Sequence, residues 1–384
     1  MNNFSYHNTT AIHFGQGQIA AITNSIPKDK KILVTYGGGS IKGNGVYDQV
    51  VTALADHNWD EFSGIEPNPQ YDTLMKAVER VRAEGFDFLL AVGGGSVVDG
   101  TKFIAAAVNF EGEEAWDILA KQGKIESALP LGCILTLPAT GSETNSGAVV
   151  TRGKEKLAFG NPLVRPQFAV LDPQTTLSLS ERQTSNGVVD GFVHVMEQYL
   201  TYPVNAKIQD RFAEGILLTL VEEGPKLIVD LQDMEARTNV MWAATQALSG
   251  LIGVGVPQDW ATHMIGHELT GNFGVDHGRS LTIVLPAIMQ VCREEKKAKL
   301  LQYAERIWNI TEGSDDARID AAIEKTKAFF SAMKTPVSLT EIDLTKADID
   351  TAMASLEAHG MTKLGENGTI DLARSRQILE TAFA

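Results

Sequence analysis

Histidines and acids in the second half of the chain have the spacing of metal ligands. Asp190 and His194 are four residues apart, and so are His263 and His267. His277 follows, directly before a glycine. In a helix, side chains four residues apart lie on one face, so each pair projects in one direction. One carboxylate and several imidazoles on converging helices suit a divalent transition metal, namely zinc, iron, cobalt or nickel.

Other interpretations of these histidines exist. A single helical histidine more often has a core or surface role, but two pairs and a further histidine favour metal ligation. Glu268 follows His267 rather than His263, so the HExxH motif of zinc proteases and its general base are not predicted. A metal-dependent hydrolase built on the His263–His267 pair stays an alternative.

A glycine-rich turn, GGGS at residues 93–96, follows an apolar run and precedes a helical pattern. Glycines let the backbone approach a ligand, and the N-terminus of the next helix offers free N–H groups and partial positive charge to a phosphate. Ser96 and Asp99 have the spacing of a capping box. The turn is not the GxGxxG fingerprint, so a tight turn without a ligand explains it equally well.

Two further turns bear on the cofactor. A second GGGS at residues 37–40 has Lys42 behind it and no acid next to it, whereas NAD sites place a carboxylate at the ribose 2′-hydroxyl. This turn therefore accommodates the 2′-phosphate of NADP, unless it is an ordinary surface turn. The segment 137–145 (LPATGSETN) offers hydroxyls and backbone N–H groups for a pyrophosphate or a nicotinamide amide, or forms a simple turn.

These motifs lie on two different kinds of element. Apolar runs at 31–36, 86–92, 131–137 and 168–171 predict strands, and the helical spacing of Tyr71 to Val81 between them predicts a parallel sheet covered by helices. After about residue 180 the patterns are helical, and they cover residues 185–202, 206–229, 236–250, 260–270, 280–307, 316–333, 348–359 and 372–383. We therefore expect an α/β domain at 1–180 and an all-α domain at 181–384, with a ligand in the cleft between them.

Composition limits the class of protein. The 384 residues are 43% hydrophobic and carry a formal charge of −15, so nucleic acid and anionic membranes are poor partners. The two cysteines, Cys133 and Cys292, suit a reducing cytoplasm, and Cys133 lies in an apolar run as a core residue. Neither a secretory signal nor a stretch of ~20 apolar residues is visible, so we expect a cytoplasmic enzyme.

Taken together and in order, the motifs resemble the iron-containing (group III) alcohol dehydrogenase family over essentially the whole chain. The resemblance is closest to its bacterial NADPH-dependent, broad-range aldehyde reductase and butanol dehydrogenase branch. The motifs that carry it are GGGS at 93–96 with Asp99, TGSET at 140–144, LDP at 171–173, Asp190-x3-His194, and H-x3-H…HG at 263–278.

The resemblance implies a Rossmann-like dinucleotide-binding α/β domain, an all-α domain and one divalent metal ion, iron or zinc. The implied metal ligands are Asp190, His194, His263 and His277. His267 is the implied catalytic residue, as a proton relay or as a group that orients its neighbours. Implied contacts to NADP(H) are Gly38, Ser40, Asn68, Gly94, Gly95, Ser96, Asp99, Thr136, Thr140, Gly147, Val149, Lys156 and Leu177. The family also implies a homodimer.

The chain departs from the usual family pattern at Gly266 and Asp276, where alanine and proline are typical. The expected reaction is metal-dependent hydride transfer between NADPH and short-chain aldehydes, reversible with primary alcohols. Phe192, Trp242, Trp260 and Phe273 are candidate pocket walls, although core packing is the default. Alternatives are a polyol dehydrogenase, a dehydroquinate-synthase-like enzyme, and a binding module without activity.

Overall fold

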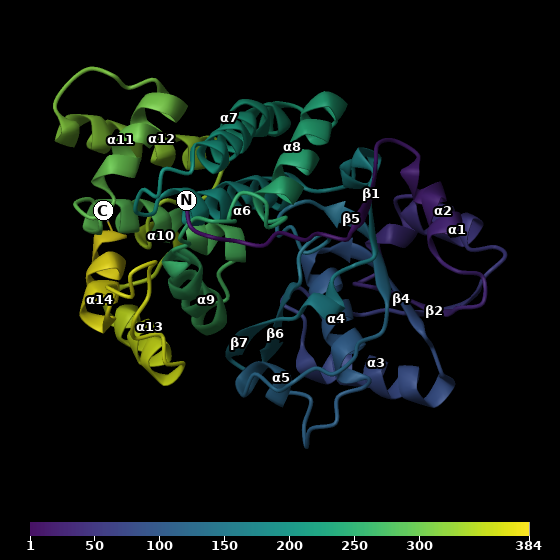
Figure 1. The fold of residues 1–384 in the computed structure, drawn as a ribbon. Helices are drawn as coiled ribbons and strands as arrows, with labels where there is room; N and C mark the ends of the chain where they lie inside the picture. The colour runs from purple at the N-terminus through teal and green to yellow at the C-terminus, as the bar shows by residue number, and fades with distance from the viewer. Residues whose placement is uncertain (384) are drawn as a thin grey trace. The chain divides into compact units, whose positions relative to one another are not determined.

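The computed structural model describes residues 1–383 and divides the chain into two compact units (Figure 1). One unit is His7–Leu179, and the other begins at Ser180 and runs to the end of the described chain. The segment Met1–Tyr6 packs with the second unit, whereas the sequence-based boundaries place it in the first domain.

The α/β unit contains a sheet of six strands in the order β1-β8-β5-β4-β2-β3. Every pairing in this sheet is parallel. The strands are β1 Ala11–Phe14, β2 Lys31–Tyr36, β3 Asn58–Phe62, β4 Phe88–Gly94, β5 Leu131–Leu137 and β8 Phe168–Leu171. An antiparallel hairpin lies outside the sheet and consists of β6 Gly147–Arg152 and β7 Glu155–Gly160. The predicted mostly parallel sheet is confirmed.

Helices cover both faces of this sheet, because its central strands are apolar on both sides. On one face, Ile32 and Val34 of β2 join a core with Val50 of the helix α2. On the other face, the Oγ1 of Thr35 lies 2.6 Å from the Oγ1 of Thr101 in the helix α4. The helices of the unit are α1 Ile22–Ser25, α2 Val46–Ala53, α3 Tyr71–Glu84, α4 Gly95–Ala107 and α5 Asp117–Ala120.

The order of the strands brings the three candidate cofactor turns together. Strand β3 lies on one side of β2 and β4 lies on the other, so the chain changes direction at β2. The register pairs Tyr36 with Val92, and Gly94 with Leu137, at the carboxyl ends of β2, β4 and β5. The turns that follow these strands are therefore neighbours, at the end of the sheet that the carboxyl ends of the strands form. This switch point is where open α/β sheets bind their ligands.

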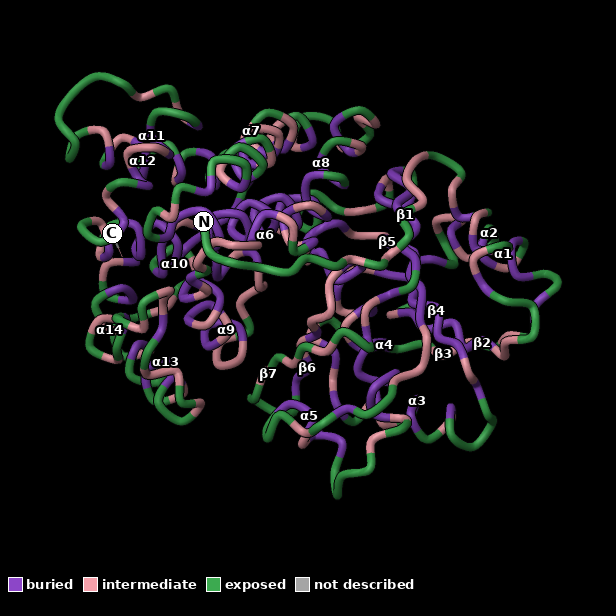
Figure 2. The backbone as a smooth tube through the Cα atoms, in the orientation of Figure 1, coloured by how far each residue is buried: buried purple, intermediate pink, exposed green. Residues whose placement is uncertain are grey.

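The second unit is helical, as predicted. Its helices are α6 Glu181–Tyr199, α7 Lys207–Val229, α8 Met234–Ala247, α9 Ala261–Phe273, α10 His277–Val291, α11 Lys297–Trp308, α12 Asp315–Ala332, α13 Lys346–Ala358 and α14 Leu372–Thr381. Helix α6 is the most central of them, since it is buried along nearly its whole length after Ser185 (Figure 2). Its apolar side chains anchor a core that also includes residues of α7, α8, α10, α11 and α12.

The single helix expected over residues 280–307 is two helices, α10 and α11. The break covers Cys292 to Lys296, where the sequence is charged and its apolar periodicity stops. Lys296 turns inward and donates to Asp259, Glu366 and the carbonyl of Leu200. A buried ammonium needs such hydrogen-bond partners. The break between α10 and α11 is therefore where Lys296 makes these bonds.

Two smaller expectations concern the membrane and the cysteines. Within residues 1–383, none of the helices is both long and apolar enough to cross a bilayer. Cys133 and Cys292 are free thiols, and both are buried. Cys133 is therefore a core residue of β5, as its apolar surroundings in the sequence predicted.

Candidate functional site

Three helices of the second unit carry the predicted metal ligands. Asp190 and His194 lie one turn apart on α6, and His263 lies in the first turn of α9. His277 is the first residue of α10. Helix α6 begins at a capping box in which Ser180 and Gln183 bond to each other's backbone, which fixes the start of the helix.

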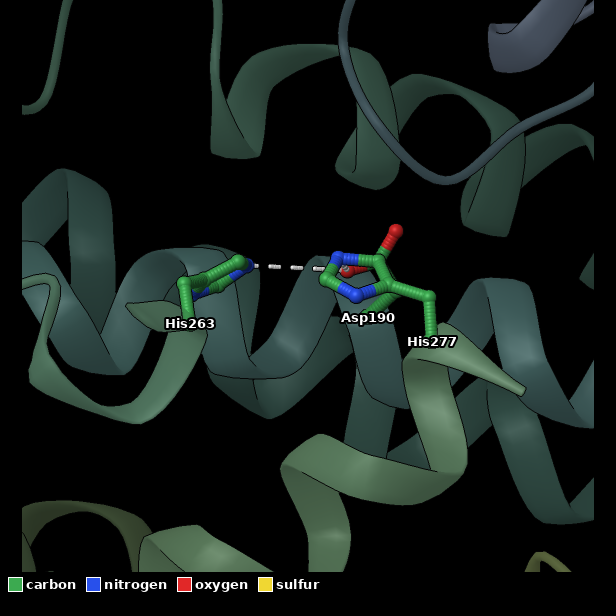
Figure 3. Close-up of side chains that lie close together, drawn as sticks. All are labelled: Asp190, His263 and His277. Atoms are coloured by element: carbon green, nitrogen blue, oxygen red, sulfur yellow. Dashed lines mark ion pairs between the residues drawn. The ribbon is translucent and has the colours of Figure 1, made fainter. Parts of the chain in front are cut away.

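The ligand atoms of these helices converge on one carboxylate oxygen (Figure 3). From Oδ1 of Asp190, the Nε2 of His263 is 3.8 Å away and the Nε2 of His277 is 3.6 Å away. Ligand atoms of these three residues all lie within 4.8 Å of one another. In a tetrahedral site with metal–ligand bonds of about 2.1 Å, neighbouring ligand atoms are about 3.4 Å apart. The spacing and the mixed oxygen and nitrogen donors therefore fit a divalent transition metal.

The other two predicted residues lie beside this cluster. His194 has its Nδ1 3.5 Å from the same Oδ1 of Asp190, and its ring stacks on that of His263 with centroids 4.6 Å apart. The ring of His267 lies 5.2 Å from the ring of His277 and 6.4 Å from that of His263. His194 Nδ1 is therefore as near to Asp190 Oδ1 as the ligand atoms of His263 and His277 are, whereas the ring of His267 lies beside their rings.

A carboxylate that was not predicted from the sequence orients His263. Glu197, on α6, is buried, and its Oε1 accepts from the backbone N–H of His263 at 2.9 Å and lies 3.0 Å from His263 Nδ1. Burial of the ring opposes protonation, yet hydrogen bonds to Asp190 and Glu197 raise the pKa of His263 to about 9. Burial also raises the pKa of Glu197, and its bonds to His263 oppose this. With Nδ1 held by Glu197, Nε2 faces Asp190.

Helix α10 is held at its start by an acid in place of the proline typical of the family. The Oδ2 of Asp276 accepts from Arg182 at 2.6 Å and from Asn186 at 2.9 Å, both on α6. Burial raises the pKa of Asp276, but these two donors lower it below its usual value overall. Gly278 is necessary beside them, because a Cβ there would lie 2.7 Å from the carbonyl oxygen of Asn186. These contacts fix the position of His277.

The glycine at position 266 allows α9 and α10 to pack closely. A Cβ at Gly266 would meet Oγ of Ser280 at 2.9 Å and Cδ2 of Leu281 at 3.0 Å. The alanine that is typical of the family would require these neighbours to shift by a few tenths of an ångström. Glycine at position 266 therefore fits the close approach of the Ser280 and Leu281 side chains of α10.

An aromatic residue borders the histidines. Trp260 has φ 63°, a left-handed conformation that is costly for a bulky residue and that often occurs at functional sites. Its ring contacts those of His263 and His194, with centroids 5.3 and 6.2 Å apart. The prediction that Phe192 forms a wall of the pocket is wrong, because this side chain is fully buried in the core against Phe329 and Phe330.

In the α/β unit, the GGGS turn at 93–96 is crowded by its own neighbours. A Cβ at Gly93 would lie 2.6 Å from Val97, and one at Gly95 would lie 2.4 Å from Oγ1 of Thr140. A Cβ at Gly94 would lie 3.0 Å from Leu137. The glycines therefore let β5 and the following loop approach the first turn of α4 closely.

The capping box expected at Ser96 and Asp99 is wrong. Helix α4 begins at Gly95 with Gly94 as its N-cap, and no side chain caps it. Ser96 instead accepts from the backbone N–H of Asn68 at 3.3 Å. Because α4 has no side-chain cap, the N–H groups of its first turn are available to a phosphate.

Asp99 binds the loop that carries the third turn. Its carboxylate accepts from Ser142 Oγ at 2.5 Å and from the backbone N–H of Val149 at 2.9 Å. One turn later, Lys102 donates to Ser142 Oγ, Asn145 Oδ1 and the carbonyl of Gly147 at 2.8, 3.0 and 2.7 Å. Lys102 is fully buried, and this desolvation lowers its pKa to about 8. Lys102 was not among the residues predicted from the sequence, although its spacing from Asp99 places both side chains on one face of α4.

The remaining predicted cofactor residues also lie in this unit. Thr136 belongs to β5, Gly147 and Val149 to β6, and Lys156 to β7, where it pairs with Thr151. Leu177 ends the short turn after Asp172, away from these strands in the sequence. The strand β7 that carries Lys156 pairs with β6, and the backbone N–H of Val149 on β6 donates to Asp99.

The first turn has an acid that the sequence did not reveal. Glu61 of β3 accepts from Lys42 Nζ at 2.7 Å and from the hydroxyl of Tyr47 at 2.5 Å. The expectation that no acid lies near Lys42 is wrong, because folding brings Glu61 next to it. The positive charge of Lys42 offsets the negative charge of Glu61. Gly38 remains open, since a Cβ there would meet no atom within 4 Å.

Comparison with known proteins gives the family. The model for "Iron-containing alcohol dehydrogenase" matches residues 9–173, and the model for "Fe-containing alcohol dehydrogenase family, C-terminal" matches residues 184–381. The chain belongs to the iron-containing alcohol dehydrogenase family.

Relatives and solved structures are similar along the whole chain. The NADPH-dependent aldehyde reductase YqhD of Escherichia coli is 59% identical over 386 residues, which cover 100% of both chains. The probable NADH-dependent butanol dehydrogenase 1 of Bacillus subtilis is 41% identical and covers 94% of this chain and 95% of its own. The substrate- and cofactor-free structure of YqhD has a TM-score of 0.94 at 58% identity and covers 99% of this chain and 100% of its own. The structure of NADH-dependent butanol dehydrogenase A from Thermotoga maritima has a TM-score of 0.95 at 36% identity, over 100% of this chain and 99% of its own.

Proposed function

We propose that this chain is a metal-dependent, NADPH-linked aldehyde reductase that reduces short-chain aldehydes and oxidises primary alcohols in the reverse direction. The observation that carries the proposal is the convergence of His263 and His277 on Oδ1 of Asp190. Membership of the iron-containing alcohol dehydrogenase family and the similarity to a relative named NADPH-dependent aldehyde reductase support it.

We assign the metal to Asp190, His194, His263 and His277. A bound divalent ion supplies Lewis-acid polarisation of the carbonyl oxygen, and a bound nicotinamide supplies the hydride. Glu197 holds the Nδ1 of His263, so that its Nε2 faces Asp190 and would be available to an ion held there. Glu197 and Asp190 also favour a proton on His263, so a metal ion held there would have to displace that proton.

We assign to His267 the relay of a proton to the developing alcohol, or the orientation of its neighbours. Its ring lies 5.2 Å from that of His277, outside the tight group of ligand atoms. An imidazole changes its protonation near neutral pH, so it is suited to deliver a proton after hydride transfer. The position beside the ligand set, rather than in it, supports this assignment.

We assign the cofactor to the turns after β2, β4 and β5. The uncapped first turn of α4 supplies N–H groups for the pyrophosphate, and Asp99 and Lys102 hold the loop 140–149 beside it. The open space at Gly38 accommodates the 2′-phosphate, with contributions from Ser40 and from Lys42, whose positive charge is reduced by its ion pair with Glu61. By the resemblance, Asn68, Thr136, Thr140, Lys156 and Leu177 also contact the cofactor.

The experiment follows NADPH absorbance with butanal, with glycerol as the polyol control, and with a chelator. We expect oxidation of NADPH with butanal only in metal-loaded protein, and recovery when zinc or ferrous iron is returned. His263→Ala should abolish turnover and bound metal, and the matched variant His7→Ala, at an exposed histidine, should keep both. Turnover by metal-free His263→Ala protein refutes the proposal.

We further propose that the enzyme is a cytoplasmic homodimer. The family resemblance and the buried free thiols of Cys133 and Cys292 support this. Light scattering of the purified protein measures the mass, and twice the 41.5 kDa of one chain is the expected value. A monomeric mass at micromolar concentration contradicts the dimer.

A further inference from the structure

The helical unit contains a cavity of about 570 Å³ that shares no lining residue with the predicted metal or cofactor sites. It lies at the C-terminal end of α6, between the loop 200–206, the first turns of α7, and α11. Its polar lining includes Gln198, Thr201, Lys207, Arg211, Lys299 and Arg306. Pockets that hold small molecules typically measure about 300–1,000 Å³, so its size suits a small organic ligand.

The charge of this cavity is opposite to that of the chain. Four of its lining side chains are basic, namely Lys207, Arg211, Lys299 and Arg306, and only Asp210 is acidic. The whole chain carries a formal charge of −15. A concave, positively charged surface on an acidic protein attracts anions locally, while the rest of the surface repels them.

The two arginines are held in place by one buried carboxylate. Glu214, on α7, accepts from Arg211 Nη1 at 2.8 Å and from Arg306 Nη1 at 2.7 Å. Tyr199 and Gln302 also donate to Glu214, each at 3.0 Å. Glu214 is the only hydrogen-bond acceptor of either guanidinium within residues 1–383. A guanidinium has five N–H donors, so most donors of each arginine remain for a ligand.

The other charges set the sign of the site. Lys299 is matched by Asp210, with which it forms a short ion pair, and its Nζ lies 4.7 Å above the ring of Tyr199. Glu214 offsets one of the three remaining cations. Lys207 forms no ion pair with any described residue. Two positive charges are therefore left uncompensated, which matches the dianionic form of a phosphate monoester.

We propose that this cavity binds a small phosphate-bearing metabolite, with the phosphate held by Arg211, Arg306 and Lys207. Arginine binds phosphate oxygens through parallel N–H groups. Because Glu214 already holds both guanidinium groups, less conformational entropy is lost when a ligand fixes them. Tyr202, Pro203 and Val204 form the less polar part of the lining and contact the organic part of the ligand.

Phenyl phosphate is the probe, because it is not an alcohol or an aldehyde and has both a dianionic and an apolar part. Isothermal titration into metal-loaded protein at constant ionic strength should show one site per chain. Arg306→Gln and Lys207→Gln should each weaken binding about tenfold, as expected for loss of a charged hydrogen bond. The matched control is Arg376→Gln on α14, whose exposed ion pair with Asp350 involves no residue of the cavity lining.

Each outcome decides the proposal. Equal binding of benzoate would show that a single carboxylate suffices, and this contradicts a phosphate site. Unchanged binding in both Arg306→Gln and Lys207→Gln, or equal weakening in Arg376→Gln, places the probe elsewhere and overturns the proposal. If Arg306→Gln fails to fold because Glu214 loses a partner, Lys207→Gln alone decides, since Lys207 makes no ion pair to lose.

Discussion

Replacing Glu197 tests how the structure prepares His263 for a metal. Glu197 is buried and makes two contacts with His263 through one oxygen, at 2.9 Å to the backbone N–H and 3.0 Å to Nδ1. Glutamine keeps an acceptor oxygen at this position but removes the charge. Alanine removes the acceptor altogether, so the Nδ1 proton is no longer fixed and the ring can turn its Nε2 away from Asp190.

The expected losses follow from these two contacts. Removal of groups that orient a metal-binding histidine typically costs 10- to 100-fold in metal affinity. We expect about tenfold for Glu197→Gln and about hundredfold for Glu197→Ala, because only alanine loses both contacts. Alanine also leaves a buried N–H without an acceptor, at a cost of about 1–3 kcal/mol in the free energy of unfolding.

Competition against a chromophoric chelator measures the zinc affinity of each variant. Glu222→Gln, at an exposed position of α7, is the matched control and should bind zinc as the unaltered chain does. Circular dichroism at each titration temperature separates lost affinity from lost fold. A zinc affinity of Glu197→Ala within twofold of the unaltered chain refutes the claim that Glu197 prepares the site.

Three further predictions concern the cofactor turn, a buried lysine and a tryptophan. Gly38→Asp fits without a clash and should raise the KM for NADPH about tenfold by repelling the 2′-phosphate, while Gly38→Ser should not; an unchanged NADPH-to-NADH preference contradicts this. The pKa of Lys102 is lowered by burial from 10.5 to about 8, so the unfolded chain binds the extra proton between these values and stability rises with pH there. Urea unfolding should therefore show that the unaltered chain gains up to about 3 kcal/mol relative to Lys102→Met between pH 8 and 10.5, and a constant difference is the contrary result. Nickel should quench the fluorescence of Trp260, whose ring lies 5.3 Å from that of His263, so Trp260→Phe should lose most of the quenching; equal quenching in both proteins would place nickel elsewhere.

Long apolar patterns predicted most of the fold. The strands β2, β5 and β8 match their predicted ranges, because each is a fully or nearly buried apolar run. The strands β1 and β3 were missed, since they lie at the two edges of the sheet and are half exposed, without an apolar run. The hairpin of β6 and β7 was missed because exposed polar residues interrupt its apolar ones.

The site was predictable where spacing within one helix decides the geometry. The pairs Asp190–His194 and His263–His267 were visible because a helix places residues four apart on one face. Glu197, Lys102 and Glu61 were not, because each acts on a residue of another element, and a charged residue in a sequence is usually exposed. Only the packing of α6 against α9, of α4 against the loop 140–149, and of β3 beside β2 reveals them.

The most direct test of the central claim is anomalous X-ray diffraction from crystals of the metal-loaded protein. We predict one ion per chain, about 2.0–2.2 Å from ligand atoms of Asp190, His194, His263 and His277. Crystals of protein that oxidises NADPH with butanal, but whose anomalous peak lies away from Asp190 Oδ1, would contradict the account.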